Sequence, residues 1–243
     1  MTELRILPLA GVPEVQEGDD VAELVADCLD LEDDDVVVLA QKIVSKAEGR
    51  VVRLDDIDPS DRARELAGDD LDPRRVEAIL RESAEIVRIR RPLIIAQTRH
   101  GFICASAGVD ASNAPAQGML VLLPEDPDAS AERIRERLRE LSGKTVGVVI
   151  TDSFGRPWRQ GTIDVAIGAA GIPVILDLRG TRDRVGYELH ATMIAVADEL
   201  ASAAELVMGK VNGIPGAVIR GLRLRGEGRA RDLAMPRERD LFR

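Results

Sequence analysis

The stretch TVGVVITDSFGRPWRQG, residues 145–161, joins an uncharged run to a cluster of charged and polar side chains. Its first six residues are rich in Val and Ile, which predicts a buried strand. The strand would end at Asp152 and Ser153 and place a carboxylate and a hydroxyl side by side at a sheet edge. Such oxygen ligands suit Mg²⁺ or Mn²⁺. The competing interpretation is a strand-to-loop turn with an Asx hydrogen bond.

Two arginines follow in the same Gly- and Pro-containing segment. Gly155 lets the backbone approach a ligand closely. Arg156 and Arg159 carry planar groups that can bind phosphate or carboxylate oxygens. Two solvated arginines in a surface loop would have the same sequence, so this segment by itself favours an anion-binding site without establishing one.

A second candidate carboxylate lies in the segment GVDASN, residues 108–113. Gly108 favours a turn, and Asp110 and Asn113 could present an oxygen and an amide together. Together with Asp152, Asp110 could hold one or two cations that neutralise a transferring phosphoryl group. Considered alone, it is equally well explained as a turn former.

Working outward, the run VVVLA at residues 36–40 predicts another buried strand, which ends directly before Gln41. Lys46 follows and is a candidate point charge for nucleotide phosphates. In isolation, a solvated lysine explains it better. The segment GVPE at 11–14 is a turn that could also contact a purine or a ribose.

Two further Gly-containing segments are ambiguous. The run MGKVNGIP, residues 208–215, could approach a nucleotide closely at Gly209 and Gly213, although a helix C-cap explains the first glycine equally well. The loop at 177–188 could close over a charged substrate or form a salt-bridged surface turn.

The remaining hydrophobic pattern predicts alternating strands and helices. We expect strands at 4–9, 93–98, 102–107, 119–124, 165–167, 174–178 and 217–222. We expect helices after a cap at Asp19 or Asp20, twice between 59 and 90, at 130–141 and at about 188–207.

Composition excludes several classes of protein. The 243 residues are 45% hydrophobic and 31% charged, so the chain has enough apolar area to fold. A net charge of -10 disfavours binding to nucleic acid. No apolar run is long enough to span a bilayer and the first residues do not resemble a signal peptide, so we expect a cytoplasmic protein. Cys28 and Cys104 lack metal-ligand spacing and are expected to be packing residues.

Common catalytic motifs are absent from the sequence. It contains no G-x-x-x-x-G-K-[ST], no G-x-G-x-x-G at a strand-helix junction and no G-x-S-x-G. Of the two histidines, His100 could contact substrate, whereas His190 is expected in the long helix as a packed or surface residue.

Five segments in order resemble the coenzyme F420:L-glutamate ligase family along almost the whole chain. They are LPLAGVPE (7–14), AQKIVSKAEGR (40–50), GFICASAGVDASN (101–113), ITDSFGRPWRQGTIDVAIG (150–168) and ELVMGKVNGIP (205–215). The chain also resembles the N-terminal half of two-domain actinobacterial homologues. It is expected to be the free-standing form, without their nitroreductase-like domain.

The resemblance implies an α+β fold peculiar to the family, with two intertwined lobes and mixed sheets flanked by helices. Residues 1–243 would form a single ligase domain without a clean boundary between the lobes. The family also implies a butterfly-shaped homodimer whose clefts hold GTP and metal.

The resemblance further implies roles for particular residues. Asp110, Asp152 and Ser153 correspond to ligands of Mg²⁺ or Mn²⁺, with two ions expected per site and K⁺ as a further expected ion. The cation Lys210 is not expected to ligate metal. Catalysis is assigned to Asp110, Asp152, Lys46, Arg156 and Arg159, the arginines as candidates for holding anionic substrates. The nucleotide-contacting positions are Val12, Pro13, Glu14, Val15, Gln41, Lys46, Asn113, Met208, Gly209, Lys210, Val211, Asn212, Gly213, Ile214 and Pro215.

The implied reaction is GTP-dependent ligation of L-glutamate to a deazaflavin precursor through an acyl phosphate, followed by a second, γ-linked glutamate. Two alternatives remain at this point. The chain could be a related nucleotide-dependent amide ligase that acts on another carboxylate. It could also be a GTP- and metal-binding protein without turnover.

Overall fold

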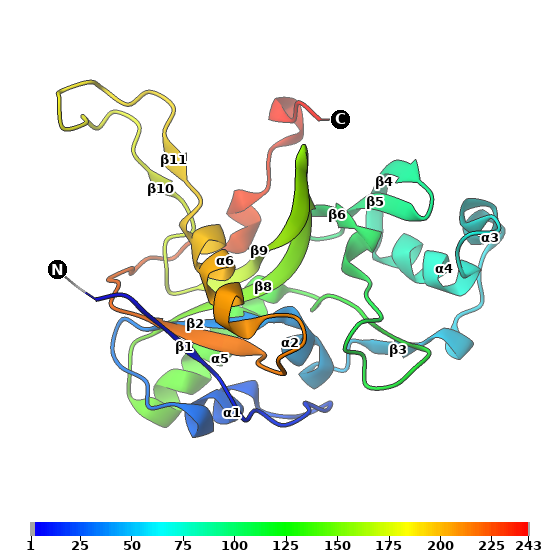
Figure 1. Ribbon diagram of the computed structural model, residues 1–243, viewed down its shortest axis with the longest axis horizontal. Coiled ribbons are helices and arrows are strands. Elements are labelled where there is room, and N and C mark those ends of the chain that lie inside the picture. The colour runs from blue at the N-terminus through cyan, green and yellow to red at the C-terminus, as the bar shows by residue number, and fades with distance from the viewer. Residues whose placement is uncertain (1–2, 243) are drawn as a thin grey trace.

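The computed structural model describes residues 3–242 and confirms the α+β class. A five-stranded mixed sheet has the order β1-β12-β2-β8-β9 (Figure 1). Its strands are β1 (Arg5–Pro8), β2 (Val36–Ala40), β8 (Gly147–Arg156), β9 (Arg159–Ala170) and β12 (Gly216–Arg220). Only β2 and β8 pair in parallel, and the other neighbours are antiparallel. The predicted strand at 36–40 is confirmed to the residue.

Helices cover both faces of this sheet, which explains the continuous apolar runs of its central strands. On one face lie α1 (Val21–Cys28), α2 (Gln41–Ala47) and α5 (Pro127–Ser142), and on the other lies α6 (Val196–Met208). Residues on alternate positions of β2 enter the two cores, Val37 on one side and Val38 on the other.

Capping side chains set the starts of two helices that pack on the five-stranded sheet, which together form the first lobe. The Asp20 carboxylate accepts hydrogen bonds from the Ala22 and Glu23 amides, which confirms the predicted cap of α1. Asp126 caps α5 in the same way, and Pro127 is the first helical residue. The helix predicted at 130–141 therefore begins three residues earlier.

A second lobe forms from the continuous segment between α2 and α5, on the right of Figure 1. It contains the pair β3 (Val51–Arg53) and β7 (Met119–Val121), and the sheet β4-β5-β6 of Ser83–Arg90, Leu93–Thr98 and Ile103–Ala105. Its helices are α3 (Asp61–Ala67) and α4 (Pro73–Glu82). It has its own core, which includes Ile79, Ile94 and Leu120.

Short 3₁₀ turns complete the chain. They are η1 (Leu54–Asp56), η2 (Ser106–Gly108), η3 (Ala230–Leu233) and η4 (Arg237–Arg239).

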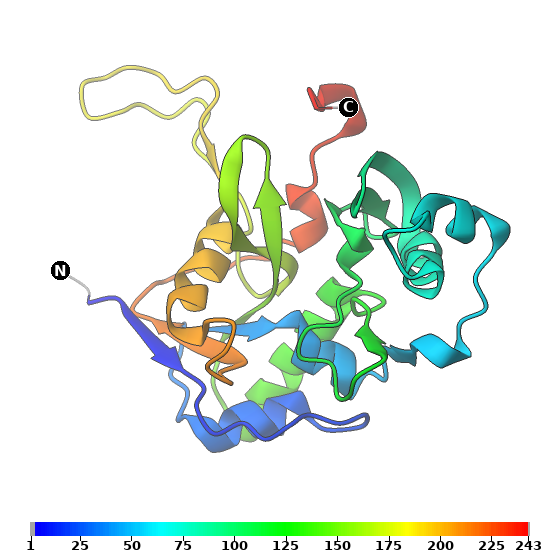
Figure 2. The same cartoon turned by 45° about the vertical axis from the view of Figure 1, so that its right-hand side comes forward.

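Two predicted helices extend too far. The second helix between 59 and 90 ends at Glu82, because residues 83–90 pair with β5 as strand β4. The long helix starts at Val196 and not near Glu188. The residues before it include β10 (Leu176–Asp177) and β11 (Met193–Ile194), so the strand predicted at 174–178 is much shorter. They form an arm that projects from the body in Figures 1 and 2, and His190 lies exposed on it, outside any helix.

The segment that follows Ile150 is a hairpin and not a loop. Strand β8 continues through Asp152 and Ser153 to Arg156, and β9 returns from Arg159, with Ser153 opposite Asp164. Figure 2 shows this hairpin rising beyond the main sheet. The prediction that the strand ends at Asp152 is wrong because cross-strand pairing with residues 159–165 extends it.

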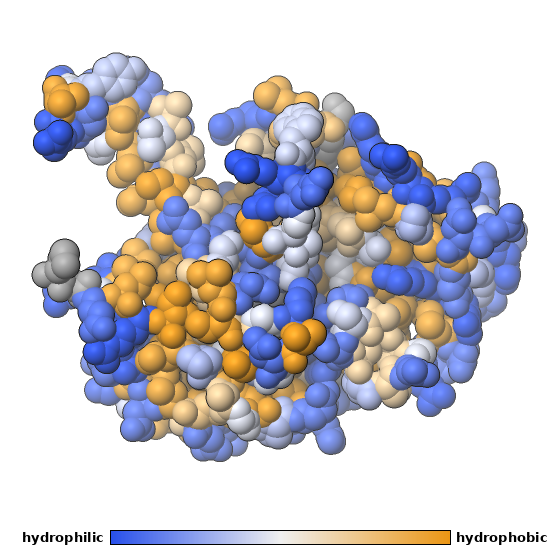
Figure 3. All heavy atoms as spheres, viewed as in Figure 1, coloured by the Kyte–Doolittle hydropathy of each residue, from blue (hydrophilic) through white to orange (hydrophobic). Residues whose placement is uncertain are grey.

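The surface view in Figure 3 shows hydrophobic residues over the part of the molecule where α6 lies. Leu206, on the face of α6 away from the sheet, is 81% exposed. Within residues 3–242, no helix is both long enough and apolar enough to cross a membrane.

Candidate functional site

A cavity of about 660 Å³ lies where α2 begins, beside β8 and the segment after α6. Five separate parts of the chain form its wall: the turn at 12–15, the junction of β2 and α2, the loop at 113–115, the β8–β9 hairpin, and residues 205–215. The cavity therefore collects segments that lie far apart in the sequence.

The positions predicted to contact a nucleotide meet in this cavity, with one exception. Those that line it are Val12, Pro13, Glu14, Val15, Gln41, Lys46, Asn113, Met208, Gly209, Lys210, Val211, Gly213, Ile214 and Pro215. Asn212 does not line it, and its side-chain amide lies beside Gly209. Gly209 is the C-cap of α6, with φ of 60°, which confirms that interpretation. It also lines the cavity, and its approach to a nucleotide stays a prediction.

Gln41 brings an unpaired donor to the cavity. The side chain is 1% exposed, and its Oε1 accepts a hydrogen bond of 2.7 Å from the Ser45 hydroxyl. Its Nε2 has no hydrogen-bond partner among the described residues. Buried amide groups are normally satisfied, so a ligand oxygen at this position would remove a free-energy penalty.

Lys46 is not the solvated lysine of the alternative interpretation. Its side chain is only 7% exposed and forms an ion pair with Glu14. An ammonium group buried to this extent is retained where a carboxylate or phosphate compensates for its lost hydration. The helix α2 thus presents a preformed cation to the cavity.

Asp152 lines the cavity from β8. Burial of the carboxyl raises its pKa to about 6, although the Ser153 backbone amide and the charges of Lys42 and Lys210 act in the opposite direction. Desolvation therefore dominates over its neighbours, and a bound cation would stabilise the ionised form.

Asp164 is a further candidate site residue, which the sequence pattern did not single out. It is 5% exposed, lines the cavity, and accepts a hydrogen bond of 2.6 Å from the Ser153 hydroxyl. Asp164 lies within one of the quoted motifs, but its position opposite Ser153 depends on the hairpin register. Recognising a hairpin around Pro157 and Trp158 would have brought it into the predicted site.

Asp110 does not line the cavity, although it lies beside it. Burial acts to raise its pKa, but hydrogen bonds from Lys42 and Ser112 outweigh this and lower it to about 2. The Lys42 ammonium lies 2.6 Å from Asp110 Oδ2. This carboxylate is ionised and already paired.

Lys42 links the two predicted metal ligands, and the sequence analysis did not single it out. It lines the cavity, pairs with Asp110, and its charge lowers the pKa of Asp152. A sequence signal existed, because Lys42 and Lys46 are four residues apart and share one face of a helix.

The donor set fits a divalent cation that is completed by substrate and water. No group of three or more His, Cys, Asp or Glu residues within 3–242 could hold a metal alone. Mg²⁺ is commonly bound by one or two carboxylates with phosphate oxygens and water. Asp152 and the neighbouring Ser153 hydroxyl provide such a partial set, and the desolvated Asp152 carboxylate lacks a direct cationic partner among the described residues.

Neither predicted arginine lines the cavity. Arg156 is half-buried and its Nε has no partner among the described residues, whereas Arg159 is exposed. Between them Trp158, 85% exposed, packs against Phe242 with ring centroids 4.7 Å apart. The arginines belong to the outer part of the hairpin.

Other predicted residues lie outside the cavity. His100 is held by the Pro124 and Glu125 carbonyls, 2.9 and 3.1 Å from Nε2, and does not line the cavity. The loop at 177–188 belongs to the projecting arm and forms local ion pairs such as Arg179–Asp177.

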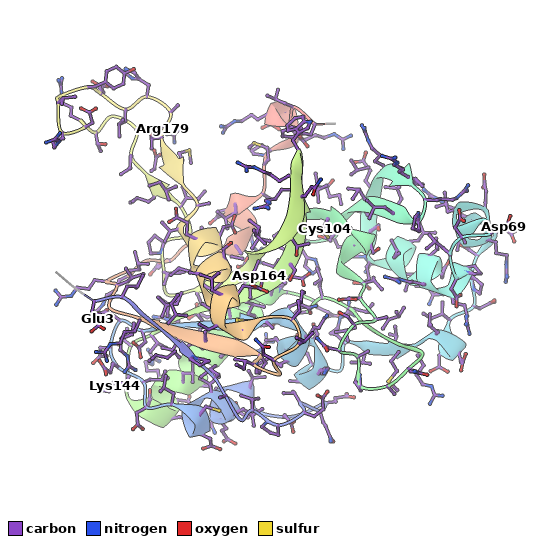
Figure 4. All side chains as sticks on the ribbon, viewed as in Figure 1. Glu3, Asp69, Cys104, Lys144, Asp164 and Arg179 are labelled. Atoms are coloured by element: carbon purple, nitrogen blue, oxygen red, sulfur yellow. The ribbon has the colours of Figure 1, made fainter. Side chains whose placement is uncertain are left out.

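Both cysteines are free thiols. Burial, and secondarily the charge of Asp152, raises the pKa of Cys104 to about 12. Cys104 is therefore an unreactive packing residue, as predicted. In Figure 4 it is labelled beside the β8–β9 hairpin, above Asp164.

A second cavity of about 730 Å³ adjoins the first and shares Glu14, Val15, Lys46 and Pro115 with it. Its other wall comes from the second lobe and includes Arg53, Asp56 and Arg81. The space beside the predicted nucleotide positions therefore continues between the lobes.

Comparisons with known proteins identify the family of this chain. Residues 11–221 match the family model described as F420-0:Gamma-glutamyl ligase. A protein of Methanopyrus kandleri is 51% identical over 99% of this chain and 98% of its own length. Proteins of Methanothermobacter thermautotrophicus and Archaeoglobus fulgidus are 46% and 43% identical, each over 99% of this chain and over 99% and 96% of their own lengths. All three are named coenzyme F420:L-glutamate ligase. This chain therefore belongs to the F420-0:Gamma-glutamyl ligase family.

Proposed function

We propose that this protein ligates L-glutamate to the deazaflavin precursor coenzyme F420-0 at the expense of GTP. The observation that carries the proposal is the cavity at the start of α2. There, the positions predicted to contact a nucleotide, which come from separate parts of the chain, lie with Asp152 and Ser153 in one cavity wall. The names of the relatives, each similar over nearly its full length, support L-glutamate and a coenzyme F420 precursor as substrates.

The first step would activate the terminal carboxylate of the precursor. Activation is needed because a carboxylate oxygen is a poor leaving group when an amine attacks to form an amide. An oxygen of the precursor's terminal carboxylate attacks the γ-phosphorus of GTP, and the bond to the β-phosphate oxygen breaks. GDP departs with that electron pair. The acyl phosphate that remains carries a good leaving group, and no proton is transferred in this step.

The chain's own residues would act by positioning and charge neutralisation, which dominate catalysis of phosphoryl transfer. Lys46 is held at the cavity by Glu14, and the free Nε2 of Gln41 can donate to a ligand oxygen. One or two Mg²⁺ or Mn²⁺ ions, held by Asp152 with Ser153 and Asp110 as further ligands, would neutralise charge on the transferring group.

In the second step the amine of L-glutamate attacks the acyl carbon. A C–N bond forms, the C–O bond to phosphate breaks, and the amine loses a proton to solvent. The product ends in a new γ-carboxylate, on which the same sequence of steps would add a second, γ-linked glutamate.

We further propose that the protein functions as a homodimer. The exposed apolar surface of α6, including Leu206, provides an area that a second copy could cover. Sedimentation equilibrium would test the homodimer. The expected role of K⁺ would be tested separately, by comparing ligase activity in K⁺ with activity in Na⁺.

The decisive experiment is mass spectrometry of the precursor after incubation with purified protein, GTP, L-glutamate and Mg²⁺ or Mn²⁺, with each component omitted in turn. Glutamylated product that requires GTP and metal supports the proposal. Nucleotide binding without any mass shift would favour an amide ligase for another carboxylate. Binding of GTP and metal without glutamate-dependent release of GDP and phosphate would indicate a protein without turnover.

A further inference from the structure

We propose that Lys42 is a catalytic residue whose ammonium contacts the phosphoryl group during its transfer. The inference rests on the proposed function, because it assigns a role within the nucleotide-dependent step. It adds a residue that none of the motif-based assignments includes.

Lys42 and Lys46 form a pair of cations on one face of α2. They are four residues apart in a helix, so their side chains project in the same direction. Both line the cavity, and each has a carboxylate partner, Asp110 for Lys42 and Glu14 for Lys46. To bind a phosphate, each lysine would only have to exchange its contact with a carboxylate for a contact with a phosphate oxygen.

Lys42 directly contacts Asp110, one of the two predicted metal ligands. Its side chain is 12% exposed, and its Nζ lies 2.6 Å from both Asp110 Oδ2 and Ser112 Oγ. Lys42 and Lys210 are the two cations that attract Asp152. The ammonium therefore lies among the groups that would surround the transferring phosphoryl.

The contacts of Lys42 also hold the site together across the two lobes. Lys42 lies in the first turn of α2, directly after β2, whereas Asp110 pairs with Val121 in the second lobe. Asp110 and Ser112 precede Asn113, which lines the cavity. A purely structural ion pair would also explain this link, and the experiment must separate the two roles.

The chemistry requires a cation that keeps its proton. As the bond between the γ-phosphorus and the β-phosphate oxygen breaks, charge builds on the leaving oxygen and spreads over the γ-phosphoryl oxygens. A lysine ammonium can stabilise that charge by hydrogen bonding without giving up a proton. Lys42 would thus act more strongly in the transition state than on bound GTP.

The test compares Lys42→Met with Lys42→Arg and with the control Lys144→Met. Lys144 also pairs with a carboxylate, Asp33 at 3.8 Å, but lies on the surface far from the cavity. Acyl phosphate formation is measured by trapping with hydroxylamine in the absence of glutamate. GTP affinity is measured by calorimetry and stability by thermal unfolding.

We expect Lys42→Met to lower kcat about 100- to 1000-fold while GTP affinity changes much less. Lys42→Arg, which keeps the charge, should recover part of the rate, and Lys144→Met should equal the wild type. A Lys42→Met enzyme that retains wild-type kcat at saturating substrates would overturn the proposal. Lack of activity in the wild type would instead count against the proposed function.

The double variant Lys42→Met/Asp110→Asn separates the catalytic role from the structural one. It removes both charges of the pair, so no unpaired buried charge is left to unfold the protein. If Lys42 only positions Asp110, the double variant reacts as fast as Asp110→Asn alone. If Lys42 contacts the phosphoryl group, the double variant loses about a further 10-fold in rate.

Discussion

Asp128 is buried and Asp152 is half-buried, and the groups that surround their carboxylates differ. Asp128 Oδ1 accepts hydrogen bonds from the Ala169 and Ala230 amides at 3.0 and 2.7 Å, and its Oδ2 accepts one of 2.9 Å from Arg231 Nε. Asp152 has one close donor, the Ser153 amide, and its two cations act only at longer range.

The difference separates a structural carboxylate from a candidate ligand. A buried charge with a full set of donors joins segments of the fold, here α5, β9 and η3, and leaves no room for a ligand. A desolvated carboxylate that lines a cavity and lacks such donors is costly to keep, and such groups cluster at functional sites. The number of donors distinguishes the two better than burial alone.

The largest expected effect is that of Asp152→Asn on activity. We expect kcat to fall by about 10³-fold, because charge neutralisation at the transferring group is lost. Thermal stability at pH 8 should be equal or higher, since an unfavourable buried charge is removed. Steady-state kinetics and thermal unfolding measure both quantities.

The matched control for this variant is Asp69→Asn, because Asp69 is an exposed carboxylate between α3 and α4 (Figure 4). It should leave both activity and stability unchanged. Near-wild-type turnover by Asp152→Asn at ordinary metal concentrations would remove Asp152 from the catalytic role.

Asp128→Asn should show the opposite pattern. Loss of the charge leaves Arg231 and buried backbone amides poorly paired, which costs roughly 3 kcal/mol of unfolding free energy. For a chain of this length the melting temperature should drop by about 10 °C. Activity of the folded protein, measured well below that temperature, should stay near the wild-type value. Loss of activity with unchanged stability would erase the contrast between the two aspartates.

The pH dependence of stability should distinguish Asp152 from Asp110. The folded pKa of Asp152, about 6, lies above its ordinary value of 3.8, so the folded state binds the proton more tightly. Stability from this group therefore falls as pH rises from about 4 to 6, by up to about 3 kcal/mol. The folded pKa of Asp110, about 2, is depressed, so its contribution is lost as pH falls from about 4 towards 2.

Thermal unfolding in EDTA across this pH range provides the measurement. Asp152→Asn should reduce the loss of stability that accompanies a rise in pH above 4. Asp110→Asn should reduce the loss of stability that accompanies a fall in pH below 4. Identical profiles for the two variants would mean that burial and ion pairing do not separate these carboxylates.

The smallest expected effect concerns the two arginines of the hairpin. Arg156→Met should lower kcat/KM about 10-fold if its unpaired, half-buried Nε meets an anionic substrate. Arg159→Met should change it less than about 2-fold, because the side chain is exposed and solvated. Equal losses for both would place the substrate along the whole outer hairpin.

Local pattern was sufficient for many features of this protein. The uncharged, β-branched runs at 36–40 and 145–150 predicted the two central strands, because a sheet covered on both faces needs apolar side chains at every position. The pair Asp19 and Asp20 predicted the start of α1 by its capping chemistry, and the structure selects Asp20 as the cap. Asp152, Ser153 and the positions predicted to contact a nucleotide followed from ordered motifs, and the cavity brings nearly all of them together.

Tertiary structure decided the features that depend on partners distant in sequence. Residues 83–90 have apolar spacing compatible with a helix, but pairing with β5 makes them a strand. Asp164 joins the site because hairpin register places it opposite Ser153, and Lys42 pairs with Asp110 although 68 residues separate them. Local propensity carries no information about such contacts, because burial, pairing and the resulting pKa values depend on which segments the complete fold brings together.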